Sequence, residues 1–384
     1  MTLNPFSFKI PGEVVFGEKS IAKLPEILAS RNISNVLLIS DRGLEAAGMV
    51  KRITDIFEAY SIKYSLFLDV EANPSCDTVD NGTAIYNSKG LDGIVCLGGG
   101  SPMDTAKAIA VLATNGGKIQ DYEGANKFKV TTVPIIAIPT TAGTGSEVTP
   151  FAVITDKKIN YKLTVFSYEI VPEVALLDPE MICTLPPLVA AATGIDALTH
   201  AIEAYLSRAA SPFSDGMAER AMEYIGENIR HFVANRNDIE AASGMLLGSM
   251  FAGIAFSWAR LGDCHAMAHP LGGFFGVPHG IANAVLLPTV LKFNALADKG
   301  KYQKIYNYIK RGKDSDDLFL PEMLIREIEE LLEQLDIPKT LAEVGVKKEL
   351  VHDMAVDAMK SGNVLINPRQ TTLVDIENLY QKAL

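Results

Sequence analysis

The side chains best suited to chemistry lie between residues 196 and 279. Asp196 and His200 are four residues apart, so on a helix both would lie on one face, one turn apart. His265 and His269 repeat this spacing, and His279 adds another imidazole. These residues include four of the chain's six histidines, and they lie in an otherwise apolar, helical half of the chain. Several ionisable groups in apolar surroundings need partners, and a divalent cation can serve all of them.

Imidazoles combined with one carboxylate favour Fe²⁺, Zn²⁺, Co²⁺ or Ni²⁺ over Mg²⁺ and Ca²⁺, which prefer oxygen ligands. The spacing does not rank these metals. Nor does it decide between His265 and His269, because both would lie on the same helical face. His231 and His352 stand alone in the sequence and are interpreted as core or solvent-facing residues.

A glycine loop suggests a second site. The apolar run at 94–97 leads directly into Gly98, Gly99, Gly100 and Ser101, and a helical stretch with proline in its first turn follows. A strand, a glycine turn and a helix together present free backbone N–H groups and a positive dipole end to a phosphate. The loop is neither a GxGxxG fingerprint nor a P-loop, so by itself it fits a plain turn equally well.

A second loop makes nucleotide binding the better interpretation. Residues 138–147 again follow an apolar strand and are rich in threonine and glycine. Two such loops at the carboxyl ends of strands in one sheet can face a common crevice. Asp41, which follows the run at 36–39, could accept hydrogen bonds from the ribose of NAD and would repel the 2′-phosphate of NADP. An N-cap role for this aspartate is the alternative.

The elements that must position these loops follow a β–α alternation through the first half of the chain. Continuous apolar runs predict strands at 36–39, 64–67, 93–97 and 135–139, buried on both faces of a parallel, doubly wound sheet. The stretch 149–166 differs, because two alternating runs flank residues 156–160. It predicts a hairpin attached to that sheet.

From about Pro186 the apolar positions fall at helical spacing, as in Met222, Ile225, Ile229 and Phe232, and again in Leu324, Ile328, Leu331 and Leu335. The proline pair at 186 and 187 breaks regular structure and can open a helix. We therefore expect an α/β nucleotide-binding domain over residues 1–185 and an all-helical metal-binding domain over 186–384, with a ligand cleft between them.

Composition agrees with a globular enzyme that acts on a small molecule. The 384 residues are 48% hydrophobic and 21% charged, with a formal net charge of −11. This acidic balance disfavours nucleic acids and anionic membranes as partners. There is no secretory signal pattern, and no apolar run reaches the roughly 18 to 20 residues of a membrane span. A cytoplasmic location is expected, and it suits four scattered cysteines without a CxxC pair: Cys76, Cys96, Cys183 and Cys264.

These residues resemble the iron-containing (group III) alcohol dehydrogenases, a family that includes lactaldehyde reductase and 1,3-propanediol dehydrogenase. The resemblance covers essentially the whole chain, and its motifs are NVLLISDRGL, GGGSPMDTAKA, IPTTAGTGSEVTPFAVITD, TGIDALTHAIEAYLS, CHAMAHPLGGFFGVPHGIANAVLLP and NPRQTTLVDIENLY. It implies an N-terminal α/β dinucleotide-binding domain and an all-α C-terminal metal-binding domain, the dehydroquinate synthase-like architecture. It also implies a dimer or larger homo-oligomer.

The resemblance also assigns residues to the two sites. The metal, Fe²⁺ with Zn²⁺ as the alternative, would be held by Asp196, His200, His265 and His279, while His269 would stay free near the nicotinamide. The NAD shell would comprise Asp41, Asn73, Gly98, Gly99, Gly100, Ser101, Asp104, Thr140, Thr141, Thr144, Val153 and Lys162. Two departures from the family pattern, Thr289 and the pair at 276 and 277, touch no ligand.

The predicted reaction is hydride transfer between NAD(H) and a small primary alcohol or aldehyde. A cation would stabilise the alkoxide as a Lewis acid, and His269 could relay the proton to solvent. The alternative is a non-redox cyclising lyase of the 3-dehydroquinate synthase type, which also uses NAD and a metal. Its phosphorylated substrate would call for several basic residues, and the segment 184–206 has none. A nucleotide sensor without activity would not need a complete ligand set.

Overall fold

The computed structural model describes residues 6–9, 12–159, 161–310, 312 and 318–384. These residues form two compact units. The α/β unit comprises residues 9–141 and 145–185, and the helical unit comprises residues 6–8, 142–144 and 186–384. The two units are described separately below.

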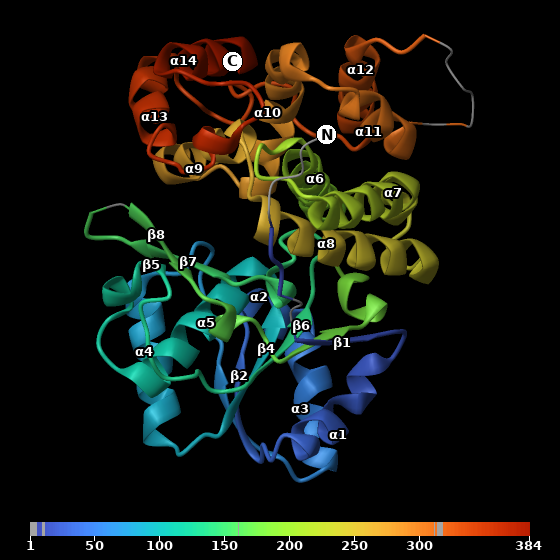
Figure 1. The fold of residues 1–384 in the computed structure, drawn as a ribbon. Coiled ribbons are helices and arrows are strands. Elements are labelled where there is room, and N and C mark those ends of the chain that lie inside the picture. The colour runs from blue at the N-terminus through green and yellow to red at the C-terminus, as the bar shows by residue number, and fades with distance from the viewer. Residues whose placement is uncertain (1–5, 10–11, 160, 311, 313–317) are drawn as a thin grey trace. The chain divides into compact units, whose positions relative to one another are not determined.

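The α/β unit is built on a parallel sheet whose strand order is β1-β9-β6-β4-β2-β3 (Figure 1). The strands are β1 (Glu13–Phe16), β2 (Asn35–Ile39), β3 (Lys63–Phe67), β4 (Gly93–Gly98), β6 (Ile135–Pro139) and β9 (Val174–Leu177). Four of them, β2, β3, β4 and β6, are the predicted strands, with ends shifted by at most one residue. The sequence analysis missed β1 and β9, which are only four residues long and complete one edge of the sheet.

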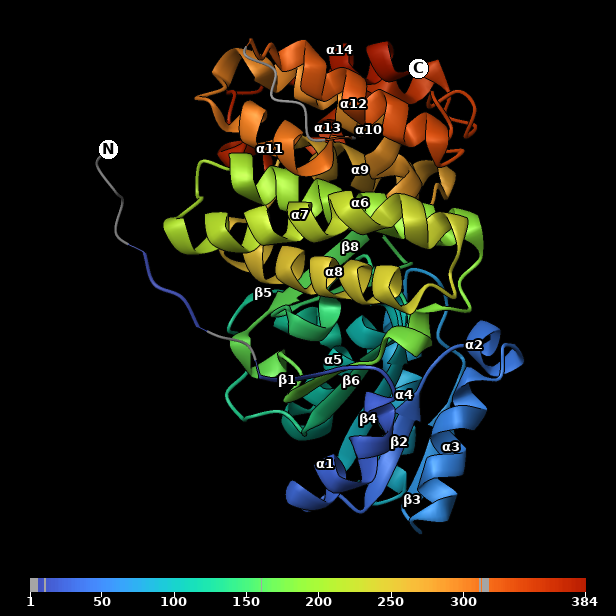
Figure 2. The same ribbon diagram turned by 90° about the vertical axis from the view of Figure 1, so that its right-hand side faces the viewer.

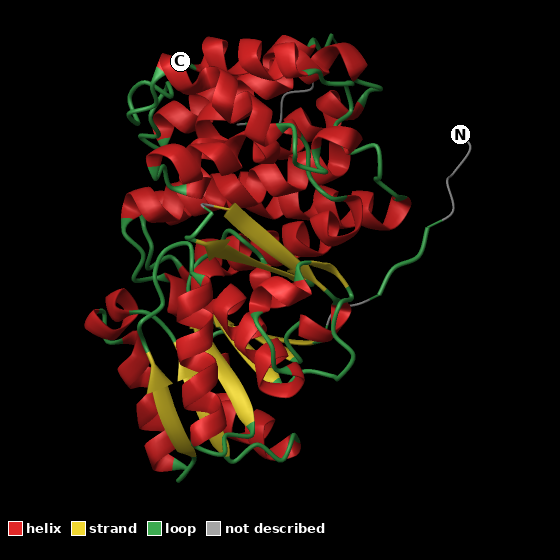
Figure 3. Cartoon of the chain, turned by 90° about the vertical axis from the view of Figure 1, so that its left-hand side faces the viewer, coloured by secondary structure: helices red, strands yellow, loops and turns green. Residues whose placement is uncertain are grey.

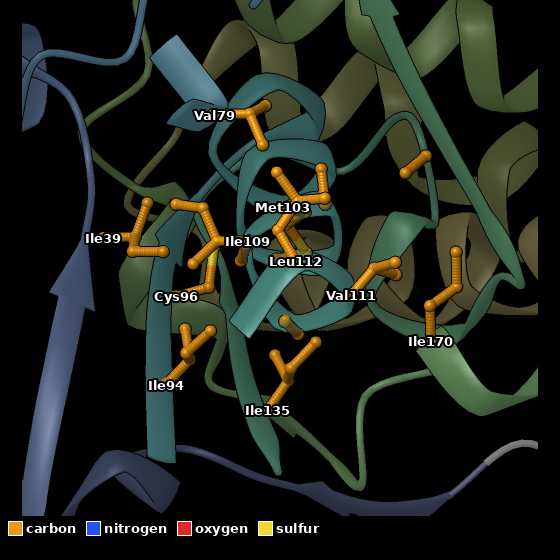
Figure 4. Packing of buried hydrophobic residues seen from close by; sticks show 14 of the residues in the cluster. Ile39, Val79, Ile94, Cys96, Met103, Ile109, Val111, Leu112, Ile135 and Ile170 are labelled. Atoms are coloured by element: carbon orange, nitrogen blue, oxygen red, sulfur yellow. The ribbon is translucent and has the colours of Figure 1, made fainter. Parts of the chain in front are cut away.

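Helices cover both faces of this sheet, so the doubly wound prediction is confirmed. The helices are α1 (Leu24–Ser30), α2 (Arg42–Ala46), α3 (Met49–Ala59), α4 (Cys76–Ser88) and α5 (Gly100–Asn115). Because side chains alternate along a strand, Val95 packs with α1 and α3 on one face, while Ile94 and Cys96 pack with α4 and α5 on the other. Figure 4 shows the second core, in which Ile109 of α5 lies among sheet residues.

The predicted hairpin exists, but it does not join the six-stranded sheet. β7 (Phe151–Asp156) and β8 (Tyr161–Phe166) are antiparallel, and β8 also pairs with the short strand β5 (Gly124–Ala125) to form a separate three-stranded sheet. Asn160, within the predicted turn, lies outside the described residues. The alternating pattern identified a half-buried hairpin but carried no information about its partner strand, which is two residues long.

The helical unit contains α6 (Pro187–Leu206), α7 (Pro212–Ala234), α8 (Ile239–Ala259), α9 (Asp263–Phe275), α10 (His279–Asn294), α11 (Lys301–Ile309), α12 (Pro321–Gln334), α13 (Val351–Ala358) and α14 (Leu373–Ala383). Figure 2 shows α6, α7 and α8 side by side. Among the residues described after 186 there are helices and loops but no strand, as predicted (Figure 3).

Local sequence explains where these helices begin and which face they bury. α6 starts at Pro187, whose missing N–H costs nothing in a first turn. On α7 the four predicted apolar positions are all buried, and on α12 Leu324, Ile328 and Leu331 are buried as well. Leu335 is also buried but caps α12 at its C-terminal end.

Two helices qualify as membrane spans by length and composition, contrary to the expectation that none would. They are Ile239–Ala259 and His279–Ala297, and more than half of each apolar window is buried inside the protein. The second begins with a histidine that points into a polar cluster described below. Small residues and single polar residues interrupt the apolar runs in the sequence, but they leave the average hydropathy high.

Candidate functional site

Three of the predicted metal ligands converge within the helical unit. Asp196 lies on α6, His265 on α9 and His279 at the first residue of α10. One ligand atom from each lies within 4.8 Å of the other two. Asp196 Oδ1 is 3.7 Å from His265 Nε2 and 3.8 Å from His279 Nε2. Helix α6 and the consecutive helices α9 and α10 thus bring one ligand atom each toward the same point.

His200 lies beside this group, one turn after Asp196 on α6. Its ring stacks on that of His265 with 4.5 Å between centroids. It is buried, and its Nδ1 has no hydrogen-bond partner among the residues that the structure describes. A buried nitrogen without a hydrogen-bond partner lowers the stability of the fold unless a ligand or an ion binds to it. The position next to three convergent ligands makes His200 suitable as the fourth.

Asn283, one turn after His279 on α10, contacts all three convergent ligands. Its Nδ2 lies 2.7 Å from Asp196 Oδ1 and 3.1 Å from Nε2 of both His265 and His279. An amide nitrogen carries two hydrogens, so it cannot donate to three acceptors at once. Together, Asp196, His200, His265, His279 and Asn283 are called the Asp196 cluster below.

The electrostatics of this cluster suit a cation. Burial raises the pKa of Asp196, but the imidazoles of His200, His279 and His265 outweigh it and hold the pKa below its usual value. Burial is also the largest influence on His265, and with the two neighbouring imidazoles it lowers its pKa well below the usual range. A carboxylate oxygen and imidazole nitrogens that lie within reach of one point form the donor set that a borderline divalent cation takes. The residues therefore fit the metal predicted from the sequence.

His269 lies near this group but does not converge with it. Its ring centroid is 5.4 Å from that of His279, and it does not belong to the set of three ligand atoms. It is half-buried, whereas His265 is fully buried on the same helix. Of the two histidines between which the sequence left the choice open, His265 belongs to the convergent set and His269 does not.

The sequence analysis missed Glu203, the third acidic or basic group on the same face of α6. Its Oε2 lies 2.6 Å from His265 Nδ1, the ring nitrogen that faces away from Asp196 and His279. Burial raises the pKa of Glu203 to about 7, although backbone N–H groups of α9 act against this. The spacing of residues 196, 200 and 203 places all three on one helical face, and this spacing could have indicated Glu203 from the sequence. Asn283 could have been found in the same way, because it lies four residues after His279.

The two predicted loops of the α/β unit come together at the ends of β4 and β6. Gly98 is opposite Pro139 in the sheet, and Gly98 O accepts a hydrogen bond from Thr140 N. Gly98 has φ +158, and a Cβ there would come within 2.5 Å of Pro102. A Cβ on Gly99 would meet Thr141 Oγ1 at 3.1 Å. Glycine is therefore required at Gly98 by its close contact with Pro102 and favoured at Gly99 by Thr141, and Gly100 and Ser101 begin α5 directly after them.

Asp104 of α5 is held in a fixed orientation. Its two oxygens accept from Ser146 Oγ at 3.0 Å and from the backbone N–H of Val153 at 3.1 Å. Burial raises its pKa, while Lys107 and these hydrogen bonds act in the opposite direction. Lys107 is fully buried and donates to Ser146 Oγ, to Thr149 O and Oγ1 and to Phe151 O, all within 3.2 Å. These residues are called the Lys107 network below.

The remaining predicted cofactor residues fall in different places. Lys162 of β8 donates to Asn73 Oδ1 at 2.8 Å, and Asn73 has the left-handed φ of 56. Asp41 caps α2 by accepting from Leu44 N at 2.9 Å, so the N-cap role weighed from sequence is present. Thr144 belongs to the helical unit, whereas all the other predicted cofactor residues belong to the α/β unit.

Comparison with known proteins gives a family for both halves of the chain. Residues 11–179 match the family described as "Iron-containing alcohol dehydrogenase", and residues 190–384 match "Fe-containing alcohol dehydrogenase family, C-terminal". The chain is 37% identical to 1,3-propanediol dehydrogenase of Citrobacter freundii, with both chains covered completely. It is also 37% identical to lactaldehyde reductase of Escherichia coli (strain K12), covering 96% of this chain and 97% of that protein.

A solved structure agrees with these matches. The crystal structure of a 1,3-propanediol oxidoreductase superposes with a TM-score of 0.96 at 36% identity, and covers 99% of this chain and all of that one. Fold and site thus define a metal-type oxidoreductase with a dinucleotide-binding α/β unit. The chain belongs to the iron-containing alcohol dehydrogenase family. The sequence predictions of an NAD-dependent alcohol dehydrogenase and of this fold class are confirmed at the level of the family, and the matches give no support to the cyclising lyase.

Proposed function

We propose that this enzyme interconverts a small primary alcohol and its aldehyde, with NAD(H) as hydride carrier and one divalent cation, Fe²⁺ in preference to Zn²⁺. The observation that carries the proposal is the convergence of Asp196 Oδ1, His265 Nε2 and His279 Nε2 beside the buried, unpartnered Nδ1 of His200. The relatives named 1,3-propanediol dehydrogenase and lactaldehyde reductase support a short, hydroxyl-bearing substrate.

In this proposal Asp196, His200, His265 and His279 hold the cation, which when bound supplies Lewis-acid stabilisation of an alkoxide. The protein contributes the rest. Asp196, His200, His265 and Asn283 are buried, and burial away from water strengthens electrostatic interactions, while His279 remains partly exposed. His269 is a half-buried imidazole beside this cluster, and an imidazole can accept a proton and pass it to solvent.

The nucleotide is assigned to the α/β unit. The diphosphate would lie on the backbone of Gly98, Gly99, Gly100 and Ser101, at the N-terminal end of α5, where backbone N–H groups and the helix dipole favour an anion. The other contacts proposed are those of Asp41, Asn73, Asp104, Thr140, Thr141, Thr144, Val153 and Lys162. Asp41 favours NAD over NADP because a carboxylate repels the 2′-phosphate.

The test is oxidation of NADH, followed at 340 nm, with a panel of aldehydes of two to four carbons. Protein would be stripped of metal with a chelator and then reconstituted anaerobically with Fe²⁺, Zn²⁺ or Mg²⁺. Turnover that returns with Fe²⁺ but not with Mg²⁺, together with about one bound ion per chain, is the expected result. Full turnover of metal-free protein would overturn the proposal.

His269→Ala tests the proton relay separately. Turnover is expected to fall about 10²-fold and to lose the pH dependence set by this imidazole, while cation binding persists. An unchanged rate and pH profile would remove His269 from the mechanism. A cytoplasmic location and a homodimer or larger assembly are also proposed, and analytical ultracentrifugation of the purified chain tests the second.

A further inference from the structure

Glu203 makes two kinds of contact with the start of α9. Oε1 accepts from the backbone N–H of Cys264 at 2.7 Å, and Oε2 lies 3.4 Å from the backbone nitrogen of His265. Both donors belong to the first turn of α9, whose N–H groups have no partner within the helix. Oε2 also lies 2.6 Å from His265 Nδ1. One carboxylate thus caps the helix and contacts the imidazole that this helix carries.

The close approach of Glu203 depends on Gly262. A Cβ at Gly262 would come within 2.9 Å of Glu203 Oε1. Glu203 is buried, and among the described residues its carboxylate accepts from two backbone N–H groups and also lies 2.6 Å from His265 Nδ1. The arrangement is therefore enclosed and specific, unlike an exposed ion pair.

We propose that Glu203 is a positioning residue of the metal centre, which fixes His265 in the tautomer whose Nε2 lone pair faces Asp196 and His279. This inference rests on the proposed metal site. Both oxygens of Glu203 already accept backbone N–H groups of α9, so the carboxylate also acts as the acceptor toward His265 Nδ1, and this nitrogen carries the proton. With Nδ1 protonated, a neutral ring keeps its lone pair on Nε2, the atom that lies 3.7 Å from Asp196 Oδ1.

The two oxygens of Glu203 make the substitution Glu203→Gln informative. The N–H of Cys264 needs an acceptor, so the amide oxygen of the glutamine must take the Oε1 position. The amide NH₂ then faces His265 Nδ1, which has to become an acceptor. The ring proton moves to Nε2 and points into the site where the cation would bind. The variant keeps the shape of the residue and the helix contact but reverses the tautomer.

The experiment measures Zn²⁺ affinity of metal-stripped protein by competition with a chromophoric chelator. Glu203→Gln is expected to bind Zn²⁺ 10- to 100-fold more weakly than the parent, the usual range for residues that orient a ligating histidine. Glu203→Asp keeps a carboxylate and should recover part of the affinity. The matched control is Asp375→Asn, another carboxylate-to-amide change in the helical unit. Asp375 accepts from Thr372 N and Oγ1 at the start of α14, and its loss should leave Zn²⁺ affinity unchanged.

A second measurement does not depend on metal binding or on the variant folding. Long-range ¹H–¹⁵N spectra of ¹⁵N-histidine-labelled, metal-free parent distinguish a protonated Nδ1 from a protonated Nε2, with His265→Asn for assignment. A proton on Nδ1 of His265 is expected. A proton on Nε2, or Glu203→Gln binding Zn²⁺ as tightly as the parent, would overturn the inference. Failure of the parent itself to bind Zn²⁺ would instead refute the proposed function.

Discussion

The Lys107 network and the Asp196 cluster bury charged groups to a similar extent but satisfy them differently. Lys107 Nζ has three hydrogens and four oxygen acceptors within 3.2 Å, so every donor can be used. In the Asp196 cluster, one amide with two hydrogens faces three acceptors, and His200 Nδ1 and Asn283 Oδ1 have no partner among the described residues.

This difference separates a structural charge from a binding site. A buried ammonium that is fully hydrogen-bonded by protein oxygens holds the segments that supply them, here α5 and residues 146–151. Several lone pairs that converge without enough hydrogens are costly by themselves and are stabilised by a cation. Removing a group should therefore cost stability in the first region and cation binding in the second.

The largest effect is expected from His279→Ala. Loss of one convergent ligand should prevent stable cation binding and lower kcat/KM about a thousandfold or more, because Lewis-acid stabilisation contributes several kcal/mol. Metal analysis and NADH oxidation measure both quantities. The unfolding midpoint of the metal-free variant should stay near that of the metal-free parent. Turnover equal to that of the parent would show that the Asp196 cluster is not a cation site.

Lys107→Met should show the opposite pattern. It removes the charge and the three N–H donors while keeping a long apolar side chain, and it leaves Thr149 O and Phe151 O without their donor. We expect a loss of about 3 kcal/mol in the free energy of unfolding. Chemical denaturation measures it. Zn²⁺ affinity should not change, and a stability equal to that of the parent would show that the network is not structural.

Glu147, which lies beside the Lys107 network, should make the free energy of unfolding depend on pH. Burial raises its pKa from 4.5 to about 7, Lys107 opposes this, and Oε1 has no partner among the described residues. A pKa raised on folding means that the folded state holds the proton more tightly. This contribution to stability is present below pH 4.5 and is lost as pH rises through about 7. Glu147→Gln should therefore match the parent near pH 5 and exceed it at pH 8 by about 2–3 kcal/mol. Parallel stability curves for the two proteins from pH 5 to pH 8 would contradict this.

The smallest effect concerns Asp41. Replacing it with Gly removes the carboxylate and should raise activity with NADPH relative to NADH about tenfold, since one like-charge repulsion is lost. The cost in stability should be only a few tenths of a kcal/mol, because glycine is tolerated at an N-cap. Asp41→Ser is the control that keeps a capping oxygen. An unchanged cofactor ratio in both variants would remove the ribose assignment.

Sequence alone determined what depends on neighbours along the chain. Runs of buried residues located β2, β3, β4 and β6, and helical spacing identified the buried faces of α7 and α12. The spacing of Asp196 and His200 placed them one turn apart on one helix. These features are local, because the side-chain periods of strands and helices act over a few residues.

Only the tertiary structure decided which distant groups meet. It favoured His265 over His269, brought Asn283 and Glu203 to the ligands, and surrounded Lys107 with acceptors from residues 146–151. It also paired β8 with β5 instead of extending the main sheet. Such contacts depend on how helices and strands pack, and a periodic pattern specifies which face is buried but not the neighbour that buries it.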